Sequence, residues 1–209
     1  SKIEKELLTI TNSINDKNVK GRTDFRKDKT FTIDPDDAKD FDDALSIKTN
    51  SNLITVGIHI ADVSHYIPAN SEIDKEASLR AFSVYFPGLV IPMIPEKLSN
   101  EICSLNPNED KLCFSVVVTI DPESYAIKSH WIGKTIINSN KRFTYGEAEK
   151  IIIENVPSEF SSEIKLLDNI AKHMRENRIK NGSIDFERRE TSFILNSDNE
   201  PIDIVEKPA

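Results

Sequence analysis

The stretch FTIDPDDAKDFDDALSI carries six aspartates within ten residues and a single cation among them, Lys39. Crowded carboxylates repel one another and lose hydration, so a folded chain keeps them together most readily when a divalent cation neutralises them. A solvated acidic turn is the plainer interpretation, because blocks of charge are usually exposed. Here, however, Phe31, Ile33, Phe41 and Leu45 interleave with the acids. This pattern favours a turn that is anchored in a core.

The aspartates of this turn are Asp34, Asp36, Asp37, Asp40, Asp42 and Asp43. Oxygen ligands without histidine or thiolate select Mg2+, Mn2+ or Ca2+ over zinc or copper. An EF-hand loop that began at Asp34 would need glycine and glutamate where Lys39 and Leu45 stand, so that calcium motif is excluded. A few aspartates with room left for water and substrate oxygens fit Mg2+ best, with Mn2+ as the other candidate.

Composition places the chain among folded proteins. With 209 residues, 38% of them hydrophobic, it can form one large core or two small ones. The two cysteines, Cys103 and Cys113, lack CxxC spacing and nearby histidines, so we expect small buried residues in a reducing, cytoplasmic compartment rather than zinc ligands or a disulfide. No apolar stretch approaches the roughly 20 residues that span a bilayer. We expect the chain to be a piece of a longer protein.

The net charge of −8 argues at first against a nucleic-acid partner, which normally leaves a basic footprint. The distribution along the chain matters more than the sum. Positive charge gathers in the C-terminal third, at Lys141, Arg142, Lys172, Arg175, Arg178, Lys180, Arg188 and Arg189. Such polarity suits a protein that holds a cation at one place and a polyanion backbone along the rest.

Local patterns predict helices and strands in mixed order. Strands are predicted over 30–33, 44–47, 53–61, 113–120 and 126–138, and again at Phe186, 191–196 and 201–205. Helices are predicted over 3–16 and 73–82, from a Thr144–Glu147 capping box through Ile153, and from Pro157 to an Asn181–Gly182 C-cap. Residues 83–100 are predicted to form an ordered loop. With no Rossmann or P-loop glycine signature, the order indicates a mixed α/β domain that leans to α+β.

Three long motifs occur in order: the acidic stretch, then VGIHIADVSHYI, then FSVYFPGLVIPMIPEKLSNEICSLNPNEDKLCFSV. Together they closely resemble the catalytic RNB domain of the ribonuclease II and ribonuclease R exoribonucleases, especially the ribonuclease R branch. The resemblance implies an α+β fold with a mostly antiparallel β-sheet core flanked by helices. It divides the chain into an N-terminal helix and connector over 1–20 and the N-terminal portion of an RNB domain over 21–209.

The resemblance implies a Mg2+-dependent hydrolase that removes nucleotides from the 3′ end of single-stranded RNA and releases nucleoside 5′-monophosphates. The family's acidic ligands follow the spacing D-x5-D-x-D-D, which falls here on Asp34, Asp40, Asp42 and Asp43. These four are the predicted metal ligands and catalytic residues, and we expect loss of Asp42 to be the most damaging. Asp36 and Asp37 lie outside the set and are expected to be exposed.

The resemblance also places aromatic side chains against RNA. Tyr85 and Phe186 align with the family residues that stack on the terminal bases, and Tyr145 matches a position near the scissile end. Stacking tolerates any sequence, as degradation of arbitrary RNA requires. His59 is predicted to be a structural, hydrogen-bonded histidine, because it lies inside an apolar strand-like run, and Asp62 is expected to brace the acidic loop.

Family proteins continue beyond the part that this chain matches. A later carboxylate-bearing helix, an arginine that contacts the scissile phosphate, and cold-shock-like and S1-like RNA-binding domains would be parts of the parent protein. We therefore expect little turnover from this chain alone. Two other functions stay open: a non-catalytic metal- and RNA-binding module, and a phosphodiesterase that acts on DNA or short oligonucleotides.

Overall fold

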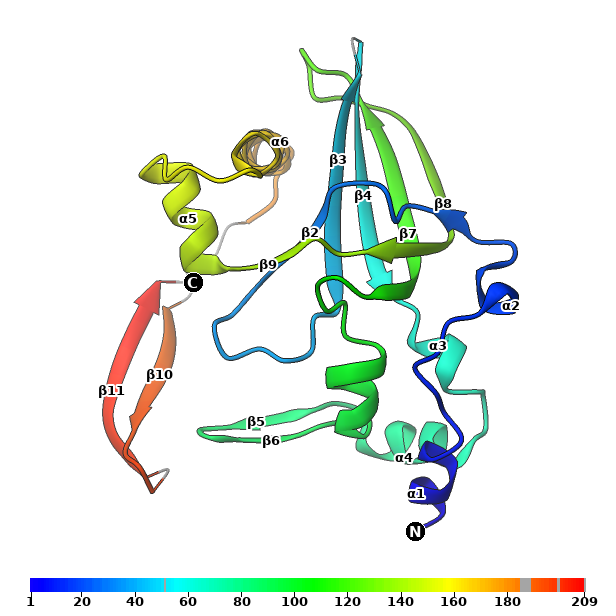
Figure 1. Cartoon of the computed structure of the whole chain (residues 1–209). Helices are drawn as coiled ribbons and strands as arrows, with labels where there is room; N and C mark the ends of the chain where they lie inside the picture. Colours follow the sequence, from blue (N-terminus) through cyan, green and yellow to red (C-terminus); the bar gives the residue numbers. More distant parts are fainter. Residues whose placement is uncertain (51, 185–188, 199, 209) are drawn as a thin grey trace.

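A seven-stranded sheet forms the centre of the computed structural model, which describes residues 1–50, 52–184, 189–198 and 200–208 (Figure 1). The strand order is β1-β8-β7-β4-β3-β2-β9. The strands are β1 (Thr23–Asp24), β2 (Thr30–Asp34), β3 (Asp43–Asn50), β4 (Leu53–Ala61), β7 (Asp110–Ile120), β8 (Ile127–Asn138) and β9 (Lys141–Thr144). Neighbours are antiparallel except for the pairs β1–β8 and β2–β9. The predicted α+β fold with a mostly antiparallel sheet is confirmed.

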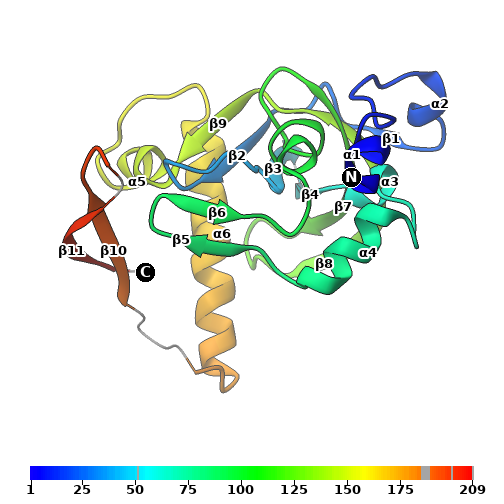
Figure 2. The ribbon, with the colours of Figure 1, turned by 90° about the horizontal axis from the view of Figure 1, so that it is seen from below.

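Helices and two small hairpins surround this sheet. The helices are α1 (Lys2–Leu7), α2 (Asp16–Val19), α3 (Val63–Tyr66), α4 (Glu72–Arg80), α5 (Tyr145–Ile153) and α6 (Ser161–Lys180), with a π-helical turn, η1 (Lys97–Ile102). The hairpins are β5 (Val84–Phe86) with β6 (Leu89–Ile91), and β10 (Arg189–Leu195) with β11 (Pro201–Pro208). Figure 2 shows the long helix α6 projecting past the sheet. None of the helices in the described ranges is both long enough and apolar enough to cross a membrane.

Aromatic packing fixes the end of the sheet where β2 and β9 pair. Phe31 and Phe143 come from these two strands, and Phe160 precedes α6; their ring centres lie 5.5 to 5.7 Å apart with edge-to-face tilts. All three are buried. Such contacts add roughly 0.5–1.5 kcal/mol per pair beyond the area they bury. They hold the β2–β9 pair rigidly against α5 and α6.

A row of buried polar groups crosses the middle of the sheet. His59 on β4 contacts Ser46 Oγ on β3 through Nε2 (2.9 Å) and Ser115 Oγ on β7 through Nδ1 (2.8 Å), and Ser115 contacts Thr135 on β8 (2.5 Å). We call these four residues the histidine row. Each is buried, and His59 is 0% exposed. The prediction of a structural, hydrogen-bonded histidine is confirmed.

Two local predictions were wrong. The helix predicted over 3–16 ends at Leu7, because the following TITNS run is rich in β-branched residues and in polar residues that compete for backbone hydrogen bonds. The segment predicted as a loop over 83–100 contains the β5–β6 hairpin and the first residues of η1. The hairpin turns at Pro87–Gly88, where Gly88 has φ of 73°, a conformation that glycine adopts without strain.

Other local signals were read correctly. The Thr144–Glu147 capping box opens α5, with the Glu147 amide donating to Thr144 Oγ1 (3.1 Å) and the Thr144 amide donating to the Glu147 carboxylate (2.8 Å). Gly182, at φ of 93°, closes α6, and the Ser183 amide donates back to the Arg178 carbonyl (3.0 Å). The strands predicted over 113–120 and 126–138 fall in β7 and β8, which pair antiparallel as a long hairpin.

Candidate functional site

The acidic loop, residues 34–43, lies where β2 and β3 part. These two strands pair only through Thr30 and Phe31, after which β2 continues along β9 to Asp34. Pro35 has no amide hydrogen to continue a ladder, and its carbonyl instead accepts a turn hydrogen bond from Ala38 (3.2 Å). The chain rejoins the sheet at Asp43, opposite Ile60 of β4. The loop is therefore anchored at both ends by sheet strands.

The aspartates of the loop have different environments. Asp34 is 7% exposed, and Asp40 is partly buried. Asp42 and Asp43 are exposed at the start of β3. Asp36 and Asp37 are exposed, as predicted for residues outside the ligand set. One buried, one half-buried and two exposed carboxylates make up the predicted set of four.

These four carboxylates form one electrostatic group. The pKa of Asp34 is raised, first by burial and then by the charges of Asp43 and Asp40. The pKa of Asp42 is also raised, first because surrounding protein reduces its hydration and then by the charges of Asp40, Asp43 and Asp34. The charges of Asp40 and Asp43 therefore disfavour ionisation of Asp34 and Asp42. A cation that bound among them would relieve this repulsion.

The four aspartates are not preset in the geometry of a metal site. Across the described residues, no group of three or more His, Cys, Asp or Glu side chains is arranged to hold a metal ion. The donor chemistry nevertheless fits Mg2+: all four side chains offer carboxylate oxygens, and Asp34 Oδ2 is buried without a hydrogen-bond partner. The four-carboxylate metal site therefore stays a prediction.

Two side chains outside the acidic loop hold its backbone, and sequence reasoning assigned neither of them to the site. Arg142 on β9 donates to the carbonyls of Pro35 and Asp36, the latter at 3.1 Å. Ser104, which is buried, donates to the Lys39 carbonyl (3.0 Å) and accepts from the Phe41 amide (3.0 Å). No local motif marks these partners, because they come from distant parts of the chain.

The predicted RNA-binding tyrosines are both exposed. Tyr85 is 68% exposed on β5, and Figures 1 and 2 place the β5–β6 hairpin on the same side of the molecule as the acidic loop. Tyr145 is 61% exposed at the start of α5. It directly follows Thr144, the register partner of Asp34, so its backbone lies next to the start of the acidic loop. Phe186 lies outside the described residues.

Asp62 does not brace the acidic loop, so that prediction was wrong. Its carboxylate accepts from Arg22 (2.6 Å) and from the Ser64 hydroxyl (2.8 Å). Burial opposes ionisation of Asp62, but these hydrogen bonds outweigh it and lower the pKa of the carboxyl. Arg22 also donates to the carbonyls of Cys113 and Thr135, so this buried pair fastens the N-terminal segment to the edge of the sheet. Both cysteines are buried, as predicted.

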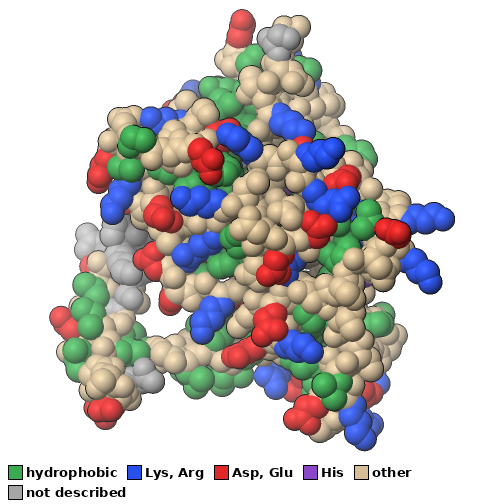
Figure 3. Space-filling view, in the orientation of Figure 1, with side chains coloured by type: hydrophobic (Ala, Val, Ile, Leu, Met, Phe, Trp, Pro, Cys, Tyr) green, Lys and Arg blue, Asp and Glu red, His purple; other side chains and the backbone are tan. Residues whose placement is uncertain are grey.

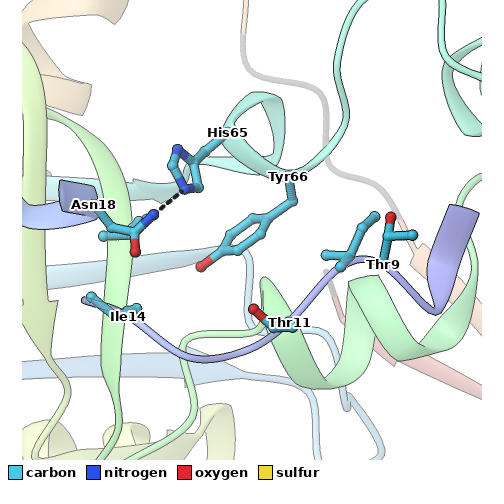
Figure 4. A pocket seen from close by; sticks show the side chains of 8 residues that line it. Thr9, Thr11, Ile14, Asn18, His65 and Tyr66 are labelled. Atoms are coloured by element: carbon cyan, nitrogen blue, oxygen red, sulfur yellow. Dashed lines mark hydrogen bonds between the residues drawn. The ribbon is translucent and has the colours of Figure 1, made fainter.

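A cavity of about 220 Å3 lies between residues 9–18 and α3 (Figure 4). Asn18 and His65 meet there through a 3.1 Å hydrogen bond, and Tyr66 forms part of the wall. Burial lowers the pKa of His65 and raises that of Tyr66 to about 12. No residue of the acidic loop lines this cavity, so it is separate from the candidate site.

Surface charge does not separate into large regions of one sign on the face shown in Figure 3, where acidic and basic side chains are interspersed. The local concentration of aspartates in the acidic loop is therefore the main electrostatic feature of the candidate site. An anionic RNA strand would approach that loop only where a cation offsets it.

Comparisons with known proteins agree with this fold. A family model described as the RNB domain matches residues 22–209, and the chain belongs to the RNB domain family. Ribonuclease R of Aquifex aeolicus is 39% identical over 206 residues, which are 96% of this chain and 29% of that protein. The chain thus spans less than a third of the length of this curated relative.

Solved structures show the same fold. Mycoplasma genitalium RNase R, solved in complex with ribose-methylated single-stranded RNA, superposes with a TM-score of 0.90 at 29% identity, covering 100% of this chain and 33% of that one. Yeast Ssd1, described as a pseudonuclease, gives a TM-score of 0.70 at 24% identity, covering 80% of this chain and 21% of that one. The second likeness concerns the fold alone, and it shows that the fold also occurs in a protein described as a pseudonuclease.

Proposed function

We propose that this chain carries part of the catalytic domain of a 3′-to-5′ exoribonuclease of the ribonuclease R type. The parent protein degrades single-stranded RNA in the cytoplasm with Mg2+ and releases nucleoside 5′-monophosphates. One observation carries the proposal: in a chain of the RNB family, the four aspartates at the family spacing form a single electrostatic group. Their mutual repulsion supports a site for a divalent cation.

The residues of the chain have separate roles in this proposal. Asp34, Asp40, Asp42 and Asp43 hold Mg2+. When bound, Mg2+, or Mn2+ in its place, neutralises these carboxylates and polarises the scissile phosphate. Tyr85 and Tyr145 are exposed and able to stack on bases near the 3′ end, and Phe186 is proposed to stack on the other side of the base.

The isolated chain is expected to turn over RNA poorly. It spans 29% of the Aquifex aeolicus relative, and we propose a parent protein of similar length. We propose that the parent supplies a phosphate-binding arginine together with cold-shock-like and S1-like RNA-binding domains. A cation at the scissile phosphate stabilises charge that develops in the transition state, and its loss costs rate rather than folding.

The test uses the intact parent protein and a 5′-labelled single-stranded oligoribonucleotide with Mg2+. The wild type should shorten the strand one nucleotide at a time from the 3′ end. Asp42→Asn should abolish the ladder, whereas Asp37→Asn, an exposed acid of the same loop, should leave it nearly unchanged. An Asp42→Asn protein as active as the wild type would refute the proposal.

A non-catalytic metal- and RNA-binding role is the second candidate, and the fold does not separate it from catalysis, because yeast Ssd1, described as a pseudonuclease, has the same fold. It predicts RNA binding without any shortening of the strand. A third arm with the matching deoxyribose strand tests the remaining candidate, a phosphodiesterase for DNA, because the 2′-hydroxyl distinguishes the two polymers. Equal rates on both strands would favour that broader activity.

A further inference from the structure

Three buried polar atoms without hydrogen-bond partners lie together on the β2–β9 pair. Among the described residues, the buried side-chain atoms without a partner are Thr32 Oγ1, Asp34 Oδ2, Tyr66 OH and Arg142 Nε. Thr32 is the register partner of Arg142, and Asp34 lies two residues further along β2. These three side chains share one face of the strand pair, since the alternate residues Phe31 and Phe143 pack on the other face.

Arg142 joins both halves of the acidic loop. Its guanidinium donates to the carbonyls of Pro35 and Asp36, and its central carbon lies 5.5 Å from the ring centre of Phe41. A planar guanidinium can make several such contacts at once, because its donors form a fixed fork and its face stacks on an aromatic ring. The Arg142 side chain therefore contacts both the first turn of the loop and Phe41, the residue just before Asp42.

The contacts of Arg142 leave the carboxylates free. It hydrogen-bonds backbone carbonyls, and none of the six aspartates of the loop forms an ion pair with another described residue. The charge of Arg142 favours the ionised form of Asp34 without an ion pair, so its direct bonds go to the loop backbone alone. The side chain thus shapes the loop without occupying the oxygens that a metal would use.

We propose that Arg142 is a positioning residue that holds the acidic loop in the conformation in which Asp34, Asp40, Asp42 and Asp43 act on one cation. Because this rests on the proposed function, the test has one arm that does not depend on metal or RNA. Lys141 provides the matched control: it is the neighbouring cation on β9, and its ammonium lies 4.4 Å from the ring centre of Phe143. Among the described residues, no hydrogen bond or ion pair joins its side chain to the loop.

The first arm measures loop order by hydrogen–deuterium exchange of the 209-residue chain. Arg142→Met should speed exchange of the Ala38 and Phe41 amides by about tenfold or more, because each hydrogen bond lost from a charged donor held the loop closed. Exchange in β4 and β7 should not change, and Lys141→Met should behave like the wild type throughout. Unchanged exchange of the loop amides in Arg142→Met would overturn the inference.

The second arm measures Mn2+ binding from the signal of the free ion in electron paramagnetic resonance. Removing a positive charge near a cation site should by itself tighten binding. A positioning role predicts the opposite sign, so Arg142→Met should bind Mn2+ about tenfold more weakly despite the lost charge. Equal or tighter binding would overturn the inference. If the wild-type chain binds no Mn2+, the proposed metal site fails, while the exchange arm still decides the role of Arg142.

A third arm separates positioning from general destabilisation. Arg142→Lys keeps the charge but loses the fork, so it should recover part of the loop protection and part of the Mn2+ affinity. In the intact parent, Arg142→Met should lower kcat with little change in KM for RNA, and Arg142→Lys should restore part of kcat. If Arg142→Met does not fold, intermediate loop exchange in Arg142→Lys carries the inference, and wild-type exchange there overturns it.

Discussion

The histidine row makes the stability of the chain depend on pH in a way that can be worked out from one residue. His59 is fully buried between two hydroxyls, and burial lowers its pKa to about 4 from an ordinary value near 6.5. Between these two pH values His59 is protonated in the unfolded chain but stays neutral in the folded chain. The stability that depends on neutral His59 is therefore fully present above pH 6.5 and is lost as the pH falls toward 4.

The magnitude follows from the size of the pKa shift. Each pKa unit corresponds to about 1.4 kcal/mol, so His59 should destabilise the chain by about 3 kcal/mol once the pH reaches 4. At pH 5 the loss should be about 2 kcal/mol relative to pH 7.5. The assay is urea unfolding at both pH values, followed by the fluorescence of Trp131, the single tryptophan of the chain.

The refuting result comes from comparing variants. His59→Asn cannot take up a proton, so it should lower stability at pH 7.5 but remove most of the difference between pH 7.5 and pH 5. His130→Gln, at an exposed position on β8, is the control for losing a histidine. If His59→Asn keeps the whole pH difference of the wild type, buried His59 is not its source and the reasoning fails.

Three further substitutions test contacts in the sheet and at the acidic loop by urea unfolding. Asp62→Ala should cost about 3–5 kcal/mol, because it leaves Arg22 buried without its partner, and a cost below about 1 kcal/mol would contradict the ion pair. Ser104→Ala should cost about 1–3 kcal/mol and speed exchange of the loop amides, whereas unchanged exchange would remove Ser104 as an anchor. Gly57→Ala should cost about 2 kcal/mol or more, since its Cβ would lie 2.4 Å from the Ser46 hydroxyl of the histidine row. Wild-type stability of this variant would show that the side chains of the row can move aside at little cost.

Local signals predicted the elements that depend on neighbouring residues. The capping box at Thr144 and the glycine after α6 satisfy the backbone groups of helix ends. Both could be predicted because the hydrogen-bond partners lie within a few residues of each other in the sequence. Runs rich in apolar and β-branched residues marked the strands β4, β7 and β8. The same kind of signal was present but unused at Pro87–Gly88, where a proline–glycine pair between two apolar runs indicates a tight turn.

Long-range partners could not be predicted in the same way. The parallel pairing of β2 with β9 brings Thr32 against Arg142 across more than a hundred residues. The sequence shows Arg142 only as one basic residue among several, and nothing nearby marks the carbonyls it binds. Asp62 was misassigned for the same reason, because its partner Arg22 precedes it by 40 residues. The motif identified the carboxylates, whereas the side chains that hold their loop became visible only in the fold.

The repulsion among the aspartates of the loop lowers the stability of the free chain but favours binding of a cation. A carboxyl whose pKa is raised on folding destabilises the folded chain above its unfolded pKa, and acid relieves that cost. Asp34 and Asp42 are of this kind, whereas His59 loses stability in acid. The repulsion persists in the folded chain because the contacts described around the loop go to its backbone and leave its carboxylates without ion pairs. A bound divalent cation would offset that cost, so the same feature that weakens the free chain would favour the loaded one.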